Sequence, residues 1–178
     1  PLPVAASRAL EGYRENVLLF ERVAAMVRQL AAFRQSCLII AAAGNESMRD
    51  EDPDFEVGVS PPAVSEGNIS VGALGAGNGG GLRIADFSNT GAMLSAPGVS
   101  ILSAGQPPDG FALMSGTSMA TPHAAGVAAL WGEKLQRMGM LNTPNWSAQL
   151  LASCVTAGLA TPFDPTDVGA GLVQAPQN

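Results

Sequence analysis

The chain has few of the side chains on which enzyme chemistry most often depends. Its 178 residues include one histidine, His123, and two cysteines, Cys37 and Cys154. A metal site needs more ligands than these, and the cysteines lack the Cys-x-x-Cys spacing of zinc and redox motifs. We therefore expect no metal site built on them. Two buried free thiols are the favoured interpretation of Cys37 and Cys154, and a disulfide between them is the alternative.

Charge and long apolar runs are also scarce. Charged residues make up 13% of the chain and hydrophobic residues 47%, as expected of a globular protein. The formal net charge of −6 argues against nucleic acid as a partner. Apolar stretches such as 38–43 and 127–131 are far shorter than the roughly 20 residues of a membrane helix, so no membrane partner is expected. The chain opens on Pro1 without a basic-then-apolar signal pattern, and the sequence leaves the localisation unknown.

Apolar periodicity predicts an α/β domain. Apolar residues spaced by four and three predict a helix over 7–33 with Ser7 as its N-cap. Further elements are predicted as strands at 37–43, 69–74, 99–103 and 111–114, a glycine-rich turn at 75–81, and helices at 118–138 and 145–157. Apolar strands that alternate with helices favour a largely parallel sheet flanked by helices. Ligands of such sheets bind beyond the carboxyl ends of the strands.

One loop concentrates the acidic residues. Its members are Glu46, Asp50, Glu51, Asp52, Asp54 and Glu56. A solvated surface loop is the favoured interpretation, and a cation site or a docking patch for basic groups is the alternative. Calcium binds several converging oxygens, but this run has no EF-hand spacing. A structural calcium ion is therefore possible here, but no motif predicts it.

Ser118 is a candidate nucleophile without a base in this chain. A serine hydroxyl needs an adjacent base to become nucleophilic. His123 lies five residues further along a predicted helix, about 140 degrees around its axis, so the two side chains diverge. We therefore predict that His123 is a packed, hydrogen-bonded histidine. A base for Ser118 has to come from outside residues 1–178.

Four short motifs resemble those of the subtilisin-like serine proteases, the subtilases. Residues 116–123, Gly-Thr-Ser-Met-Ala-Thr-Pro-His, resemble the active-serine motif, and residues 41–45, Ala-Ala-Ala-Gly-Asn, resemble the oxyanion-hole motif. Residues 95–98, Ser-Ala-Pro-Gly, resemble a turn before the serine, and residues 169–173 resemble a segment near the end of the catalytic domain. The motifs keep the family's order and cover about residues 37 to 175.

The resemblance implies a serine endopeptidase of subtilisin type. Ser118 would attack the peptide carbonyl, and Asn45 would donate to the oxyanion. A side-chain amide and a backbone N–H aimed at that oxygen stabilise it. Residues Pro61 and Pro62 would form a cis peptide at the pocket base. The resemblance also implies substrate contacts at Ala42, Ala43, Gly44, Ser60, Gly116 and Thr117. It requires no cofactor, and its partner is a polypeptide substrate.

The chain departs from the subtilases in lacking their aspartate and histidine motifs. Residues 1–178 therefore resemble the C-terminal half of a single catalytic domain. The chain is interpreted as a piece of an active protease, as a proteolytic product still paired with its other half, or as a degenerate binding module. A transpeptidase or cyclase of the same type and a catalytically silent interaction domain are the alternative functions. The open edge of the strand at 37–43 is expected to recruit the missing N-terminal half or a second copy.

Overall fold

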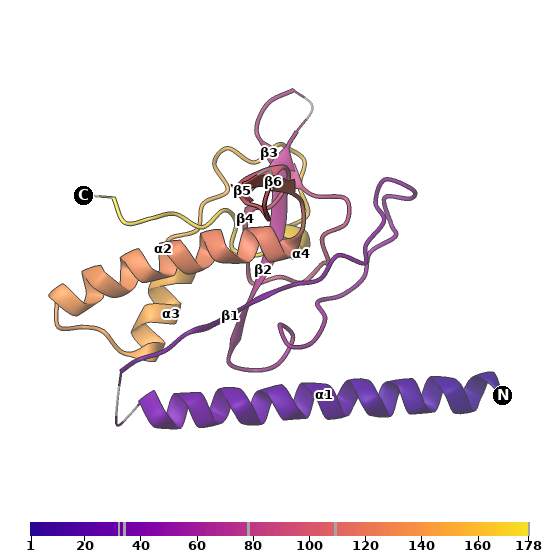
Figure 1. Ribbon diagram of the computed structural model, residues 1–178, viewed down its shortest axis with the longest axis horizontal. Coiled ribbons are helices and arrows are strands. Elements are labelled where there is room, and N and C mark those ends of the chain that lie inside the picture. The colour runs from indigo at the N-terminus through magenta and orange to yellow at the C-terminus, as the bar shows by residue number, and fades with distance from the viewer. Residues whose placement is uncertain (32, 34, 78, 109, 178) are drawn as a thin grey trace.

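The computed structural model describes residues 1–31, 33, 35–77, 79–108 and 110–177, and it shows a mixed sheet flanked by helices (Figure 1). In chain order the elements are α1 (Leu2–Ala31), β1 (Ile39–Ala42), β2 (Asn68–Ala76), β3 (Leu82–Ile84), β4 (Leu94–Pro97), β5 (Ile101–Ala104), β6 (Phe111–Met114), α2 (Thr117–Arg137), α3 (Thr143–Ala152) and α4 (Pro165–Val168). Strand β2 is central, with β1 and β4 parallel on either side and β3 antiparallel near its end. The predicted α/β class with a largely parallel sheet is confirmed.

The core lies between β2 and α2. Strand β2 is buried along all but its last residue, as a central strand covered on both faces should be. Helix α2 faces it with Ala120, Ala124 and Ala128, which recur every four residues and are all buried. Side chains this small let the helix approach the sheet closely, so the start of α2 is held at a fixed place relative to the strands.

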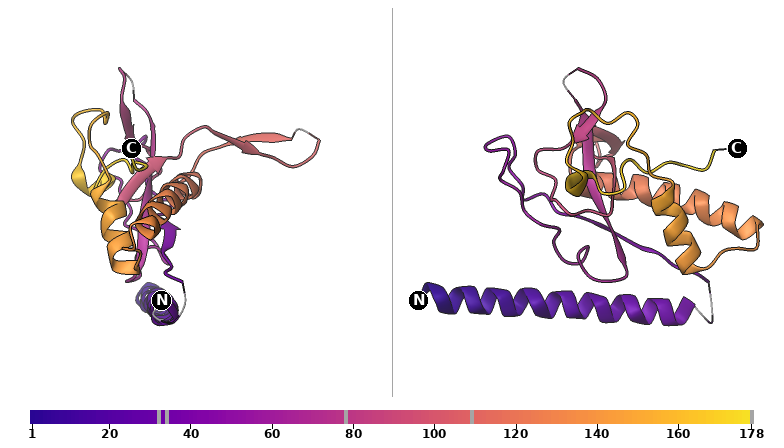
Figure 2. Two further views of the ribbon diagram at one scale, coloured as in Figure 1. Left: turned by 90° about the vertical axis from the view of Figure 1, so that its left-hand side faces the viewer. Right: turned by 180° about the vertical axis from the view of Figure 1, so that it is seen from behind.

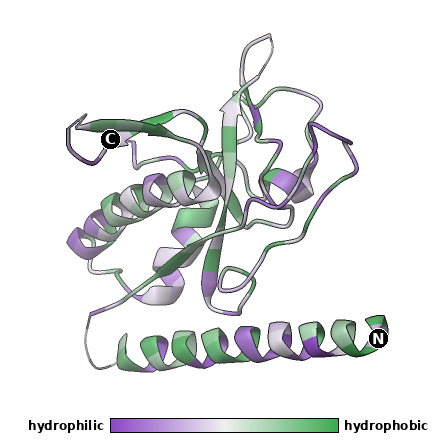
Figure 3. Cartoon of the chain, turned by 45° about the vertical axis from the view of Figure 1, so that its right-hand side comes forward, coloured by the Kyte–Doolittle hydropathy of each residue, from purple (hydrophilic) through white to green (hydrophobic). Residues whose placement is uncertain are grey.

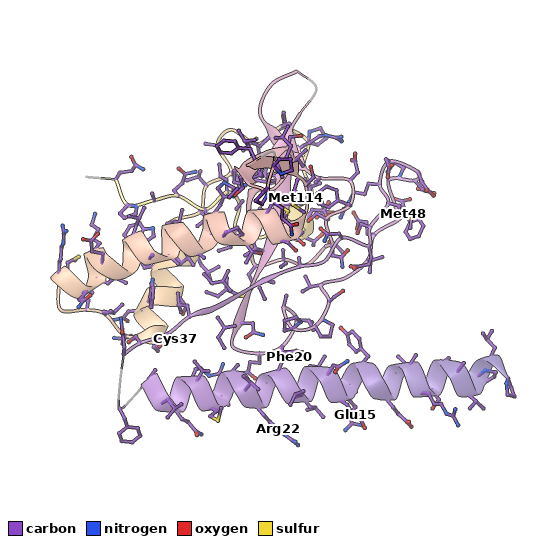
Figure 4. All side chains as sticks on the ribbon, viewed as in Figure 1. Glu15, Phe20, Arg22, Cys37, Met48 and Met114 are labelled. Carbon is purple, nitrogen blue, oxygen red and sulfur yellow. The ribbon has the colours of Figure 1, made fainter. Side chains whose placement is uncertain are left out.

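Helix α1 begins earlier than the sequence predicts. The amides of Val4 and Ala5 donate to the Pro1 carbonyl, and Pro3 sits in the first turn, where a missing N–H is tolerated. Ser7 therefore lies inside the helix, and its prediction as the N-cap is wrong. The predicted inward face is retained in part: Phe20 points toward the body of the protein, whereas Glu15 and Arg22 point away from it (Figure 4), but Tyr13 of that face is exposed.

Helix α1 lies along one side of the sheet and carries apolar residues on both of its sides. Figure 3 shows hydrophobic and hydrophilic positions alternating along its whole length. Ala24 is the one buried residue of Leu2–Ala31, all of which the structure describes. None of the helices in the described ranges combines the length and apolar content that a membrane crossing requires.

Three short elements, β3, β4 and α4, are absent from the sequence-based prediction. Strands β3 and β4 have three and four residues, too few to show a period, and both are held by pairing with β2. Strand β1 is shorter and less buried than predicted, with half-buried residues at three of its four positions. Within the described part of the chain β1 pairs with β2 alone, so its second edge is open.

Both cysteines are free, so the disulfide alternative is wrong. Cys37 is exposed, because β1 begins only at Ile39 and the thiol precedes the sheet. Its predicted burial is therefore also wrong. Cys154 is half-buried, and burial raises the pKa of its thiol to about 11. Burial disfavours the thiolate, so Cys154 is a poor nucleophile at neutral pH.

Candidate active site

The end of β1 and the start of α2 meet at one edge of the sheet. The backbone N–H of Thr117 donates to Asn45 Oδ1 at 2.8 Å, and the Thr117 hydroxyl lies 3.1 Å from the same oxygen. The N–H of Gly44 donates to the Thr117 hydroxyl oxygen at 3.2 Å. Asn45 and Thr117 are 72 positions apart in the sequence. The structure thus brings Asn45 beside the residue that precedes Ser118.

These hydrogen bonds fix which way the Asn45 amide faces. A backbone N–H can only donate, so the atom of Asn45 that meets it is the oxygen. The amide nitrogen, Nδ2, is on the other branch of the same planar group and points away from Thr117. No acceptor for Nδ2 is found in the described ranges. Asn45 is exposed, and Nδ2 is therefore available to donate to a bound molecule.

Ser118 is exposed in the first turn of α2 and offers a second donor. The amides of Met119 and Ala120 donate to the Gly116 carbonyl at 3.0 and 3.3 Å, and the amide of Thr117 is used by Asn45. The Ser118 N–H has no acceptor in the part of the chain that the structure describes. Free N–H groups and the helix dipole at a helix start both favour negative charge. The Ser118 N–H is therefore a free donor in the residue next to Thr117, which holds Asn45.

The predicted wall and base of the substrate pocket are joined through the backbone. Ala42 ends β1, and the Ser60 amide donates to the Ala43 carbonyl at 2.9 Å. The Pro61–Pro62 peptide is cis, as the sequence predicts. Gly116 and Thr117 are buried behind the exposed Ser118. All of the predicted site residues therefore belong to one connected region.

Asn89 is a buried part of this region that the sequence analysis missed. Its Nδ2 lies 2.7 Å from a Glu46 carboxylate oxygen, 3.3 and 3.1 Å from the carbonyl oxygens of Ala43 and Gly58 and 3.3 Å from the Ser60 hydroxyl, and its two hydrogens are shared among these acceptors. Its Oδ1 accepts from the amides of Glu46 and Ser47. One fully buried amide therefore holds the pocket wall, the pocket base and the loop that follows Asn45 together.

The close packing around Asn89 explains the glycine at position 44. Gly44 has a φ of +114°, and a Cβ there would lie 2.3 Å from Asn89 Nδ2 and 2.5 Å from a Glu46 carboxylate oxygen. Any larger residue would push Asn89 or Glu46 away and disturb Asn45 next to it. The sequence shows Asn89 only as a polar residue in a turn-like stretch, and nothing marks it as buried.

His123 is not placed to act as the base of Ser118. Its Nδ1 lies 2.9 Å from the Met119 carbonyl oxygen on its own helix, and its side chain is exposed. The predicted hydrogen bond is confirmed. The predicted packing is wrong, because His123 falls on the solvent side of α2. Ala124, the next residue, faces the sheet instead.

The acidic loop is attached to the body by a buried arginine. Arg49 pairs with Asp167 at 2.5 Å and with Glu56 at 3.0 Å, and it donates to the Ser88 carbonyl. The side chains of Arg49 and Asp167 are 8% and 7% exposed, so solvent screens this pair little. Burial raises the pKa of the Asp167 carboxyl, and the nearby Arg49 cation opposes that rise without cancelling it. Among the described residues no group of three or more His, Cys, Asp or Glu converges as a metal site would require.

Gly98 contacts Gly116, the residue before α2. We expect Gly98→Ala to destabilise the protein. The Gly116 amide donates to the Gly98 carbonyl at 2.8 Å. A Cβ at position 98 would lie 2.8 Å from both the Gly116 carbonyl oxygen and the Ala73 side chain. Overpacking of this kind costs about 1–3 kcal/mol in free energy of unfolding, which urea denaturation measures.

The matched control for that substitution is Gly126→Ala in the exposed part of α2. A Cβ at Gly126 meets nothing within 4 Å. This change should stabilise the protein by roughly 0.5–1 kcal/mol, because alanine favours the helix. Equal effects of the two substitutions would contradict the crowding at Gly98.

Comparisons with known proteins identify the family of this chain. A sequence profile of the Subtilase family matches residues 14–165. Alkaline elastase YaB from a Bacillus strain is 36% identical over 140 residues, 78% of this chain and 32% of that protein. Subtilisin BL from Lederbergia lenta is 34% identical over 148 residues, 82% of this chain and 47% of that protein.

A solved structure, that of the prenylagaramide maturation protease PagA, is also similar. It superposes with a TM-score of 0.61 at 30% identity and covers 82% of this chain and 50% of that one. The chain thus spans between about a third and a half of the length of these relatives. The profile match extends over most of the chain and includes both strand β1, which ends before Asn45, and helix α2, which carries Ser118. The chain belongs to the subtilase family of serine proteases.

Proposed function

We propose that this chain provides the nucleophile and oxyanion hole of a serine endopeptidase. The Ser118 hydroxyl oxygen attacks the carbonyl carbon of a substrate peptide, and its proton passes to a base. The negative oxygen that develops accepts hydrogen bonds from Asn45 Nδ2 and the Ser118 N–H. The observation that supports this most directly is the Asn45 oxygen held by Thr117, since it leaves the amide nitrogen free to donate.

The rest of the reaction follows from the same groups. The C–N bond breaks as the base returns the proton to the leaving amine, and the acyl group remains on Ser118 as an ester. A water oxygen then attacks the ester carbonyl while the base takes a proton from that water, the bond to Ser118 Oγ breaks, and Oγ takes the proton back as the carboxylic acid leaves. Each step needs a base, an acid and a stabilised oxyanion, and no cofactor.

The base and its orienting carboxylate have to come from another polypeptide segment. The chain contains one histidine, and it is bonded to its own helix. We propose that residues encoded before Pro1 supply a histidine and an aspartate, and that residues 1–178 form the C-terminal part of one catalytic domain. Residues 1–178 alone are then expected to be inactive.

The substrate is a polypeptide that lies between the two halves of the site. We propose that Ala42, Ala43 and Gly44 form one wall of the pocket for the side chain before the scissile bond. Ser60 lies at its base, held by Asn89, and Gly116 and Thr117 lie beside the nucleophile. The small side chains of this wall leave room for a bound residue.

A fluorophosphonate probe tests the proposal, because it reacts only with an activated serine. Incubated with the full-length protein, the probe is expected to modify Ser118, which peptide mass spectrometry identifies. The Ser118→Ala variant is the control and should show no labelling at this peptide. A folded full-length protein that is not labelled at Ser118 would overturn the proposal and favour a silent interaction domain.

A further inference from the structure

A large apolar cavity lies between α1 and the body of the protein, at the end of the sheet where β1 and β2 begin. Its volume is about 750 Å³, and Ile39 and Asn68, the first residues of the two strands, line it. Figure 2 shows α1 below the rest of the chain in both views, next to this end of the sheet. Asn45 follows the other end of β1, and neither Asn45 nor Ser118 lines the cavity. The cavity is therefore separate from the proposed oxyanion hole.

Most of the cavity wall is apolar. Helix α1 contributes Val27 and Ala31, the strands contribute Ile39 and Ile69, and α3 contributes Leu151. A cavity of roughly 300–1,000 Å³ with mostly apolar walls and a few well-placed polar groups is typical of a small-molecule site. The size and the lining of this cavity fit that description.

Asn68 brings an unpaired hydrogen-bond acceptor to this wall. Asn68 is 7% exposed, and its Nδ2 donates to the Pro62 carbonyl oxygen at 2.6 Å, which fixes the orientation of the amide. Its Oδ1, on the other branch of the planar amide, is buried and has no hydrogen-bond donor among the described residues. Native structures rarely leave a buried acceptor without a donor, because its lost hydration is then not replaced. A donor on a molecule bound in the cavity would supply this hydrogen bond.

We propose that the cavity binds an uncharged, mostly apolar small molecule that donates a hydrogen bond to Asn68 Oδ1. The apolar wall selects an apolar body, and the unpaired acceptor selects an N–H or O–H group on it. Charge favours neither an anion nor a cation, because Arg28 and Glu66, the charged residues of the described lining, have opposite signs. The inference goes beyond the proposed function and does not depend on it.

Cys37 provides a direct measure of binding. Its thiol is exposed and it lines the cavity, whereas the half-buried Cys154, with a thiol pKa of about 11, reacts slowly with alkylating reagents. The probe is 2-phenylindole, an apolar molecule with one N–H group. In the full-length protein it should slow alkylation of Cys37 by iodoacetamide about tenfold when present at roughly ten times its Kd, because only unoccupied protein reacts. Mass spectrometry of the Cys37 peptide measures this rate.

A matched compound tests the hydrogen bond to Asn68. In 1-methyl-2-phenylindole a methyl group replaces the hydrogen of the N–H, so the molecule cannot donate. We expect it to bind roughly two- to tenfold more weakly than 2-phenylindole, as the loss of one hydrogen bond implies. Equal affinities of the two compounds would overturn the proposed contact with Asn68.

Two variants of α1 test the place of binding. Val27→Trp puts a larger side chain into the cavity and should abolish the protection of Cys37 by 2-phenylindole. Leu10→Trp, at a residue that is 70% exposed and does not line the cavity, should keep it. Thermal denaturation shows whether Val27→Trp is folded, and the two indoles give their result in the parent protein alone. Absence of protection in the parent, or equal protection in a folded Val27→Trp variant, would overturn the site.

Discussion

Asn45→Leu in the full-length protein should lower the rate of Ser118 acylation by about 10²–10³-fold, a magnitude that was measured in a subtilisin. Leucine has nearly the shape of asparagine but cannot donate a hydrogen bond. Leucine removes both the free amide nitrogen, which would donate to the oxyanion, and the oxygen that accepts from Thr117, and the Thr117 substitutions below measure the contribution of that oxygen. The effect should fall on kcat with little change in KM, because the oxyanion forms only after substrate binding.

Two substitutions at Thr117 test whether the orientation of Asn45 matters as well as its presence. Thr117→Val removes the hydroxyl that lies 3.1 Å from Asn45 Oδ1 and accepts from the Gly44 N–H at 3.2 Å, but it keeps the backbone N–H that donates to Asn45 at 2.8 Å. Each neutral hydrogen bond contributes about 0.5–1.5 kcal/mol, so the loss in kcat should be roughly tenfold. Thr117→Ser keeps the hydroxyl and should be close to the parent. An Asn45→Leu variant with unchanged kcat would show that the oxyanion is stabilised elsewhere.

The two ends of this site could be predicted from the sequence, because short motifs carry them. Gly44-Asn45 follows an apolar run, and Ser118 lies two residues after Gly116 at the start of a long alanine-rich helix. Each motif consists of residues that are adjacent in the chain, so a sequence alone is enough to recognise it. The resemblance also implies that Asn45 and Ser118 converge, and the hydrogen bond from the Thr117 N–H to Asn45 Oδ1 places the start of α2 beside Asn45, where the packing of α2 against the sheet holds it.

The parts that the sequence did not predict depend on contacts between distant residues. Strands β3 and β4 are too short to be recognised by period, and their pairing with β2 holds them in place. Asn89 and Arg49 are polar residues in loops, where a sequence favours exposure. Their burial depends on distant partners such as Ser60, 29 positions from Asn89, and Asp167, 118 positions from Arg49. The same reason explains Cys37 and His123, whose exposure depends on where β1 begins and which side of α2 meets the sheet.

Arg49→Met should lower the free energy of unfolding by about 3–5 kcal/mol, because it leaves the buried Asp167 carboxylate without its cation. Arg49 and Asp167 are both less than 10% exposed, and Arg49 also holds Glu56 and the Ser88 carbonyl. The matched control is Arg137→Met, which removes an exposed pair with Glu133 on α2. Surface pairs contribute about 0–1 kcal/mol, so the control should stay close to the parent. Urea denaturation of both variants measures the difference.

The pH dependence of this loss identifies its cause. Burial raises the pKa of Asp167 above its usual range, and removing the Arg49 cation should raise it further. A carboxyl whose pKa is higher in the folded state stabilises that state below the unfolded-state pKa, and this contribution is lost as the pH rises through the folded-state pKa. The stability gap between Arg49→Met and the parent should therefore be widest near neutral pH and narrow in acid, where Asp167 takes up a proton. A gap that does not change with pH would mean that lost packing around the Arg49 side chain, and not the unpaired charge, destabilises the variant.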